Sequence, residues 1–327
     1  MADIGSGILS GFFKANPYAT CFSTSAGVVT LNQDIRVSVG GLLRKYLPGA
    51  TVVLPALSAG TDYAIYACSD GTLQASDNFS APAGYTTANS RRIGGFHYAP
   101  GGNASGLSAG GNTTPQINPY SLWDLKFRPA CPDPRGMTLV ANQFWCDIYL
   151  CGVNHHVDGT SKFNVAIADG NSPAKIPTMF GGNGASAYPS FNWWQASEVL
   201  ISHGKDSLSY AEFCAAMYGV VENSSGGTDP VSTILRPTFT SFWGVMLATG
   251  NLWVWGRDFG GDHAAGGWAD TNGGRGQVYM QSNAALLGGN WAHDVYSGSR
   301  CSSWSYLPSV SSDSVGARGR CVHLAHV

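Results

Sequence analysis

The sequence predicts an α+β fold in which a small all-β domain, of the sandwich or barrel type, precedes a larger domain that mixes helices and strands. Three features of the chain support this prediction. The first part, up to about residue 90, has strand-like patterns broken by glycine and proline. Two segments with helix signals follow in the second half. The C-terminal part combines short strand patterns with loops rich in glycine and tryptophan.

The composition is that of a globular protein with few charges. The 327 residues are enough for one large or two ordinary domains, and 44% of them are hydrophobic. Charged residues make up only 12%, the formal net charge is −2, and no basic patch is present, so a nucleic-acid partner is not expected. The 43 glycines, 10 tryptophans and 14 tyrosines are typical of loop-rich, β-containing chains such as many viral and extracellular binding proteins.

No targeting or membrane-spanning segment is predicted. The N-terminal stretch MADIGSGILSGFFK has no basic residue before Lys14 and only a short apolar run, which argues against a signal peptide. No apolar stretch has the length of a membrane span, so membrane insertion is not expected.

The eight cysteines are predicted to be buried free thiols in a protein made in a reducing cytoplasm. None forms a CxxC motif or a Cys/His set with zinc spacing, so no metal or other cofactor is expected. The eight are Cys21, Cys68, Cys131, Cys146, Cys151, Cys214, Cys301 and Cys321.

Residues 1–93 form the predicted β domain, and its clearest element is a hairpin. A β-rich run from Asp62 to Cys68 meets the turn Ser69-Asp70-Gly71, and a second short strand follows. The segment VSVGGLLRKYLPGATVVLPAL predicts further strands with breaks at glycine and proline.

Residues 94–120 form a long stretch rich in Gly, Asn and Ser. This composition predicts a linker or an extended crossing segment. A loop of this length in a compact fold often wraps a neighbouring subunit or the other domain.

Residues 121–327 form the predicted larger domain. The segment MTLVANQFWCDIYLCGVNHH has strand-like alternation around Phe144. The segment NWWQASEVLISHG predicts a helix with Gly204 as its C-terminal cap. A second helix begins with a capping box, Ser209 and Glu212, and ends at Gly219. Short strands and Gly/Trp-rich loops follow, and this order fits a C-type-lectin-like domain.

Two motifs raise the possibility of a metal site, and for both a polar turn is the preferred interpretation. In the segment 154–158 (NHHVD), adjacent histidines on a strand would point to opposite faces. The segment 257–263 (RDFGGDH) offers oxygen ligands for calcium in a glycine loop, but its spacing matches no EF-hand.

Hydrolase signatures are absent from the sequence. It contains neither G-x-S-x-G nor H-E-x-x-H, and its only glutamates are Glu198, Glu212 and Glu222. The best catalytic alternative is an enzyme of the formylglycine-generating type, which shares the lectin-like architecture. Such an enzyme would use a pair of close reactive cysteines, for which Cys301 and Cys321 are the candidates.

The segment from Gly288 to Cys321 alternates residues of no common chemistry with tryptophans, glycines and arginines. A period of two indicates one face of an extended chain. Four residues are expected to serve as scaffold. Two tryptophans would point inward, and two arginines would bind irregular loop carbonyls. These four are Trp291, Arg300, Trp304 and Arg318. The alternative is an ordinary irregular edge of a C-terminal sheet.

Long stretches of the chain resemble the major tropism determinants, the receptor-binding proteins at the tail-fibre tips of certain phages. They include RRIGGFHYAPGGNA, INPYSLWDLKFRPA, DPRGMTLVA, GVNHHVDGTSKFNV, SSGGTD, FWGV, LWVWG, TNGGRGQVY and AALLGG, with SGSR and GARG near the end. The similarity spans about residues 55–327 and begins weakly near Gly11. The sequence is expected to begin near the family's second domain, without a match to its N-terminal β-prism, and it differs from the family at Val322, where the family has aspartate.

The resemblance implies a particular source of variation in the segment of about residues 288–321. Members of the family are variable proteins of diversity-generating retroelements, in which an error-prone reverse transcriptase mutates template adenines. Mutated AAC codons become NNC, which cannot encode Trp, Met, Lys, Glu or Gln, and none of these occurs at the matching positions. The matching positions are Asn290, Ala292, His293, Asp294, Tyr296, Ser303, Ser305, Tyr306, Val310, Ser312, Ser314 and Val315. Most fall on the predicted outward face; His293, Tyr306 and Val315 do not and are expected at turns.

The function that these observations predict is non-catalytic receptor binding. The resemblance implies a homotrimer at the tail-fibre tip of a virion, made in the host cytoplasm and attached to a phage tail-fibre protein. The partner would be a host bacterial surface protein, or a glycan; the protein is preferred because the sugar motifs Glu-Pro-Asn and Trp-Asn-Asp are absent. Tyr296, Tyr306 and His293 are the candidate hot spots. The alternatives are the formylglycine-type enzyme and a structural fibre protein without receptor binding.

Overall fold

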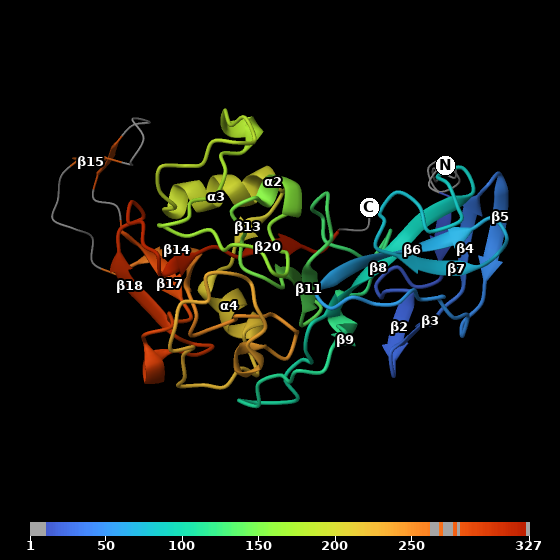
Figure 1. The fold of residues 1–327 in the computed structure, drawn as a ribbon, viewed down its shortest axis with the longest axis horizontal. Coiled ribbons are helices and arrows are strands. Elements are labelled where there is room, and N and C mark those ends of the chain that lie inside the picture. The colour runs from blue at the N-terminus through green and yellow to red at the C-terminus, as the bar shows by residue number, and fades with distance from the viewer. Residues whose placement is uncertain (1–10, 262–267, 271–276, 280–281, 325–327) are drawn as a thin grey trace, which may run out of the picture. The chain divides into compact units, whose positions relative to one another are not determined.

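The computed structural model describes residues 11–261, 268–270, 277–279 and 282–324. Within these residues the chain is mainly β-strand with few helices, which confirms the predicted α+β class at that level (Figure 1). The chain divides into two compact units. The first contains the chain up to Pro100, residues 115–130 and the C-terminal residues from His323; the second contains residues 101–114 and 131–322.

The first unit consists of strands around one apolar core. Its three-stranded sheet has the order β1-β4-β5, a larger sheet has the order β10-β8-β6-β7 with β9 paired to β8, and β2 and β3 form a hairpin. The strand bounds are β1 Phe12–Lys14, β2 Phe22–Ser25, β3 Val28–Leu31, β4 Ile35–Val39, β5 Leu42–Tyr46, β6 Thr61–Cys68, β7 Leu73–Ser76, β8 Ser90–Ala99, β9 Gln116–Ile117 and β10 Trp123–Asp124; η1 is Pro119–Ser121.

Both predicted strand patterns of the first unit are confirmed. β6 and β7 form the expected antiparallel hairpin, and Asp70 accepts a hydrogen bond from the Thr72 backbone N–H (3.0 Å) at its turn. β4 and β5 are joined through Gly40 and Gly41, which have φ of 57° and 76°. Two successive residues with positive φ suit a tight hairpin turn, and this is why glycines occur there.

The segment 94–120, expected to link or cross between domains, contains regular structure at both ends. Its first six residues continue β8, and its last residues include β9. Residues 101–114 belong to the second unit, where the backbone N–H groups of Ala104 and Gly111 donate to the carbonyls of Ser241 (3.1 Å) and Pro237 (2.8 Å).

The second unit contains two four-stranded sheets and a small two-stranded one among its described residues. One sheet has the order β11-β12-β20-β13, the next β18-β17-β14-β19, and β15 pairs with β16. β14 and β19 are parallel. The bounds are β11 Met137–Val140, β12 Phe144–Asp147, β13 Asp206–Ser207, β14 Trp253–Gly260, β15 Trp268–Asp270, β16 Gln277–Tyr279, β17 Asn283–Leu287, β18 Ser302–Tyr306, β19 Val315–Gly316 and β20 Gly319–Val322.

Both predicted helices are present. α3 (Trp193–Ser202) begins at a capping box of Asn192 and Gln195, and Gly204 follows its C-cap with φ of 68°. α4 (Tyr210–Ala216) begins at the predicted capping box of Ser209 and Glu212. It ends three residues before the predicted Gly219. The remaining short elements are α2 (His155–Asp158), η2 (Thr178–Phe180), η3 (Pro237–Phe239) and η4 (Asp294–Tyr296). None of the helices in the described residues is long and apolar enough to cross a membrane.

The strand pair around Phe144 is present, but the expected alternation is wrong. Every residue of β11 and β12 is buried, because both faces of this sheet are covered. The predicted strand in FWGVMLATGNLWVWG begins only at Trp253; the preceding residues form turns and bends.

A buried arginine at the end of the chain holds the second unit together. The Arg318 guanidinium donates to the carbonyls of Asp147 (2.9 Å), Ile148 (2.7 Å), Met246 (2.7 Å) and Leu247 (3.2 Å). These carbonyls lie at the end of β12 and in the irregular segment before β14. Burial lowers the pKa of Arg318, and the nearby Cys146 and Asp147 oppose this effect.

We predict that Arg318→Met lowers the free energy of unfolding by about 3–5 kcal/mol, because it leaves several buried carbonyls without a donor. Equilibrium urea unfolding measures this loss. The matched control is Arg300→Met at an exposed arginine, for which a change within about 0.5 kcal/mol is expected. Equal losses in the two variants would contradict the role assigned to Arg318.

Candidate functional site

The candidate site is the variable segment, defined as residues 288–321, and its first part is not the predicted extended strand. Residues 291 and 292 form a turn, and residues 294–296 form the 3-10 helix η4. Asp294 has a positive φ of 40°. The outcome differs from the prediction because Gly288 and Gly289, with φ of 97° and 83°, turn the chain sharply at the end of β17.

The turn and η4 expose consecutive residues rather than alternate ones. Ala292, Asp294 and Tyr296 are exposed as expected, and Tyr296 has 77% of its surface accessible. Val295, predicted to point inward, is exposed as well. A 3-10 turn directs successive side chains around its axis, so a period of two does not apply here.

Asn290 is a correction to the predicted outward face, since it is buried. Its side-chain oxygen accepts a hydrogen bond from the Ala292 N–H (3.0 Å) and contacts His293 Nδ1. The half-buried His293 ring packs edge-on against Trp253, with 5.1 Å between ring centroids. Asn290 therefore stabilises the turn, and His293 offers only part of its surface.

Strand β18 keeps the predicted alternation only from Ser303 to Ser305. Its pairing with β17 shifts register before Tyr306, so Ser305 and Tyr306 are both exposed. Ser303 and Ser305 lie on one face, with their hydroxyls 2.9 Å apart. Trp304 is half-buried and packs edge-on against Tyr210 at 6.2 Å between ring centroids. Tyr306, at the end of the strand, is 38% exposed.

The last variable positions are less accessible than Ala292, Asp294 and Tyr296 of the loop. Val310, Ser312 and Ser314 are half-buried, and the two serine hydroxyls are 2.9 Å apart. Val315 was expected at a turn, but it lies fully buried in β19, opposite Trp253. Its side chain belongs to the apolar core of the second unit.

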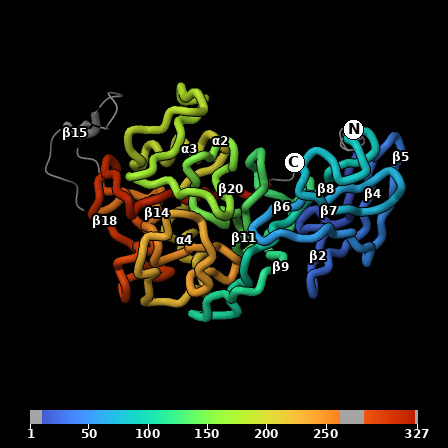
Figure 2. Tube along the Cα trace, in the orientation of Figure 1, coloured from blue at the N-terminus to red at the C-terminus, as the bar shows by residue number. Residues whose placement is uncertain are grey.

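The sheet β18-β17-β14-β19 brings these positions together. Ser302 of β18 and Val254 of β14 both pair with Leu287, and Trp253 pairs with Val315. The loop 288–301 and the residues that lead into β19 therefore meet at the same end of this sheet. Strands β14 and β18 of the sheet are labelled in Figure 2. Tyr306 lies at the other end of β18, about 13 Å of strand away.

The supporting segment, Glu222–Gly227, was missed by sequence reasoning as part of the site. The Glu222 carboxylate accepts hydrogen bonds from the Ser299 backbone N–H (2.9 Å) and hydroxyl. The Ser225 hydroxyl donates to the Trp291 carbonyl (2.8 Å) and accepts from the Asp294 N–H (3.1 Å). The Gly227 N–H also donates to Trp291 (3.0 Å). These contacts span more than 60 residues of sequence, so no local pattern could have revealed them.

The four scaffold residues have different environments. Trp291 and Trp304 are half-buried against the core, and Arg318 binds loop carbonyls as described above. Arg300 is exposed, and in the described part of the chain its guanidinium donates to no loop carbonyl. Its backbone carbonyl instead accepts a hydrogen bond from the Tyr210 hydroxyl (2.7 Å). Within the described residues, Arg300 thus contributes through its main chain, and the expected contact of its guanidinium with a loop carbonyl is not observed.

The histidine motif 154–158 forms α2 rather than a simple polar turn. His155 is buried; its Nδ1 lies 2.9 Å from His203 Nε2, and its Nε2 donates to the Lys175 carbonyl at 2.7 Å. Burial lowers the pKa of His203 to about 4. No group of three potential metal-ligating side chains was found within the described residues. In the calcium candidate 257–263, Asp262 and His263 lie outside the described residues, while Asp258 accepts from the Tyr210 N–H (2.6 Å).

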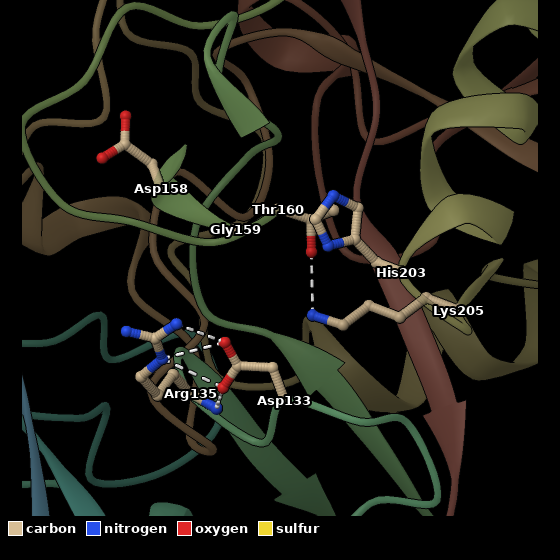
Figure 3. A pocket seen from close by; sticks show the side chains of 7 residues that line it. All are labelled: Asp133, Arg135, Asp158, Gly159, Thr160, His203 and Lys205. Atoms are coloured by element: carbon tan, nitrogen blue, oxygen red, sulfur yellow. Dashed lines mark hydrogen bonds and ion pairs between the residues drawn. The ribbon is translucent and has the colours of Figure 1, made fainter. Parts of the chain in front are cut away.

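A small polar pocket lies beside these histidines and not at the variable segment. Figure 3 shows Lys205 donating to the Thr160 hydroxyl (2.8 Å), with the Asp133–Arg135 ion pair opposite. The Lys205 ammonium also pairs with the buried Asp147 at 2.5 Å. The polar groups that line the pocket form hydrogen bonds and ion pairs with one another, so we interpret them as a structural network and not as a binding site.

The cysteine pair that the enzyme alternative would need, Cys301 and Cys321, receives no support from the geometry. Burial raises the pKa of Cys301 to about 11, so that its thiol is protonated at neutral pH. The Cys321 sulfur accepts a hydrogen bond from the Cys131 N–H (3.1 Å) and lies 3.7 Å from the Gly204 carbonyl. All eight cysteines are free in the structure; six are buried, whereas Cys214 and Cys301 are half-buried.

Comparisons with known proteins agree on one family. Residues 19–124 match the family model described as the Mtd second domain. The chain is 51% identical to the "Tail fiber receptor-binding protein" of Bordetella phage BPP-1, covering 97% of this chain and 86% of that protein. Among solved structures, the Major Tropism Determinant U1 and I1 Variants each match with a TM-score of 0.94, at 50% and 51% identity, covering 96% of this chain and 86% of theirs.

We predict that Glu222→Ala loosens the loop 288–301, because the Ser299 N–H and hydroxyl lose their charged acceptor. The loss in stability should be about 1–3 kcal/mol, and amide hydrogen exchange in the loop should accelerate. Glu198→Ala is the matched control, since Glu198 lies on α3 and accepts from Tyr188 (2.7 Å). Unchanged exchange in residues 288–301 of Glu222→Ala would refute the supporting role.

Proposed function

The chain belongs to the major tropism determinant family, and we propose from this membership that it binds a host-cell receptor as part of a phage tail fibre. The proposal rests on one observation. Large side chains of the variable segment are exposed, while hydrogen bonds from other parts of the chain hold the backbone that carries them. Tyr296 projects from η4 while the backbone around it is held by Ser225 and Glu222. An ordered backbone lowers the entropic cost of binding, and tyrosine supplies contact area with few rotatable bonds.

The proposed binding surface has two parts. The loop contributes Ala292, Asp294 and Tyr296, and β18 contributes Ser305 and Tyr306. The half-buried His293, Ser303, Val310, Ser312 and Ser314 lie between or beside them and would contribute at the margins. The surface is polar and aromatic with one carboxylate, which suits a bacterial surface protein better than a highly charged ligand; a glycan is the second choice.

We also propose that the twelve positions are diversified by a retroelement. The support is that ten of them are at least partly accessible and that few make contacts on which the fold depends. Asn290 and Val315 are the exceptions, so substitutions there should be restricted to residues that keep the turn or fill the core.

The finer architecture is likewise a proposal. The order of α3, α4 and the following sheet is consistent with a C-type-lectin-like domain at 121–327, after a β domain at 1–93 and a linking segment at 94–120. By analogy with the family, we propose a homotrimer at the tail-fibre tip. Several trimers on one virion would convert weak individual contacts into strong attachment.

We predict that Tyr296→Ala and Tyr306→Ala each weaken host adsorption by about tenfold or more, as expected for aromatic hot spots. Adsorption of phage carrying each variant to host cells measures the effect. Tyr18→Ala is the matched control, because Tyr18 is 78% exposed, as Tyr296 is, but lies in the first unit. If all three variants adsorb like the parent, the chain is a structural fibre protein.

A separate prediction concerns diversification. Sequencing of sister isolates should find substitutions concentrated at the twelve positions, with Asn290 and Val315 the least varied because both are buried. The flanking DNA should contain a reverse transcriptase gene and a near-copy of the end of this coding sequence. Differences spread evenly over the chain would contradict the proposed retroelement diversification but would leave the proposal of receptor binding unaffected.

A further inference from the structure

Two cysteines that are 190 residues apart in sequence meet inside the second unit. The backbone N–H of Cys131 donates to the sulfur of Cys321 at 3.1 Å, and the Cys131 thiol donates to the Asp133 carbonyl at 3.3 Å. Both residues are almost completely buried, with 2% and 4% exposure. This pair was not anticipated, since the sequence suggested Cys301 as the neighbour of Cys321.

Cys131 and Cys321 are close enough to form a disulfide bond. With the Cys321 sulfur 3.1 Å from the Cys131 nitrogen, ordinary bond lengths limit the separation of the two Cα atoms to about 7.5 Å. Disulfides span about 4.4–6.8 Å between Cα atoms, so at most a small adjustment is required. The loop at Gly204 lies beside both residues, and the Cys321 thiol contacts its carbonyl at 3.7 Å.

Other uses of the pair fit less well. A metal ion would need further ligands, but the described residues contain no group of three candidates. The buried ammonium of Lys205 is close enough to influence Cys131, and a second cation there would be repelled. A catalytic thiolate is also disfavoured, because the hydrogen bond with Cys321 and burial raise the pKa of Cys131 far above its usual value.

We propose that Cys131 and Cys321 form an intramolecular disulfide when the protein leaves the reducing cytoplasm. The oxidant is a small disulfide such as oxidised glutathione. One cysteine thiolate attacks it and releases one glutathione thiolate; the second cysteine then attacks the mixed disulfide and releases the other. The two cysteine protons go to solvent or to the released thiolates. Two thiols are thus oxidised as one glutathione disulfide is reduced to two glutathiones.

A disulfide between Cys131 and Cys321 would stabilise the second unit because of where the two residues lie in the chain. The second unit consists of residues 101–114 and the continuous stretch from Cys131 to Val322. The bond would join the two ends of that stretch and enclose the variable segment up to β20. A crosslink over so long a loop restricts the unfolded chain strongly. Because the thiols are buried and protonated, oxidation should be slow at neutral pH and faster at alkaline pH.

The test is incubation of the native chain with oxidised glutathione at pH 7 and pH 9, followed by alkylation under denaturing conditions and intact mass measurement. We expect the loss of two alkylation sites, faster at pH 9, and a crosslinked peptide containing Cys131 and Cys321. The melting temperature should rise by about 5 °C or more in the oxidised protein and return to its original value after reduction.

Matched variants separate this pair from the other thiols. Cys301→Ser should retain the crosslink and the thermal shift, whereas Cys131→Ser and Cys321→Ser should each lose both. Eight alkylated cysteines after prolonged oxidation of the folded protein would overturn the proposal. So would a stable glutathione adduct at either residue without the internal bond, or a crosslink that involves Cys301. The wild-type result alone decides the matter if a variant fails to fold.

Discussion

The second unit depends on the interaction of the Arg318 guanidinium with four backbone carbonyls. These carbonyls belong to residues 147–148, at the end of β12, and to residues 246–247, in the irregular segment before β14. A buried carbonyl without a donor costs free energy, and one planar guanidinium with five N–H groups satisfies several at once. Beside it, Gly319 approaches Asp147 so closely that a Cβ would lie 2.6 Å from the carboxylate. The arginine and the glycine therefore fix how the C-terminal strand enters the core.

The charge of this arginine is balanced by a network rather than by one partner. Asp147 accepts hydrogen bonds from Lys205 (2.5 Å), Thr160 (2.7 Å) and the Gly319 N–H (3.2 Å). Two cations thus surround one buried carboxylate, and the Arg318 guanidinium is neutralised chiefly by carbonyl dipoles. Such a network tolerates no single deletion, because each member leaves buried partners unpaired.

Local signals predicted the local structure, and long-range contacts account for the failures. The capping boxes at Asn192 and Ser209 and the glycine turn at Gly40 depend on neighbours within a few residues, so the sequence is sufficient to find them. On β18 the period of two held from Ser303 to Ser305, where a partner strand enforces the pleat, and it failed at the register shift before Tyr306. Among the described residues, residues 290–296 have only an isolated bridge from Asn290 to Asn251 and no strand partner beyond it. Their shape is set by Glu222 and Ser225, far away in sequence, and periodicity could not reveal it.

The difference between contacts made by the main chain and contacts made by side chains explains how one fold can present many different binding surfaces. A position can vary freely when the contacts that order its backbone are made by other residues. Tyr296 meets this condition, because its N–H donates to the His293 carbonyl (2.9 Å) while its ring remains in solvent. Asn290 does not, because its own side chain closes the turn, and Val315 does not, because its side chain fills the core. Tolerance to substitution should therefore follow the division between main-chain and side-chain contacts, and it should decline toward both ends of the variable segment, where the chain enters and leaves the sheet.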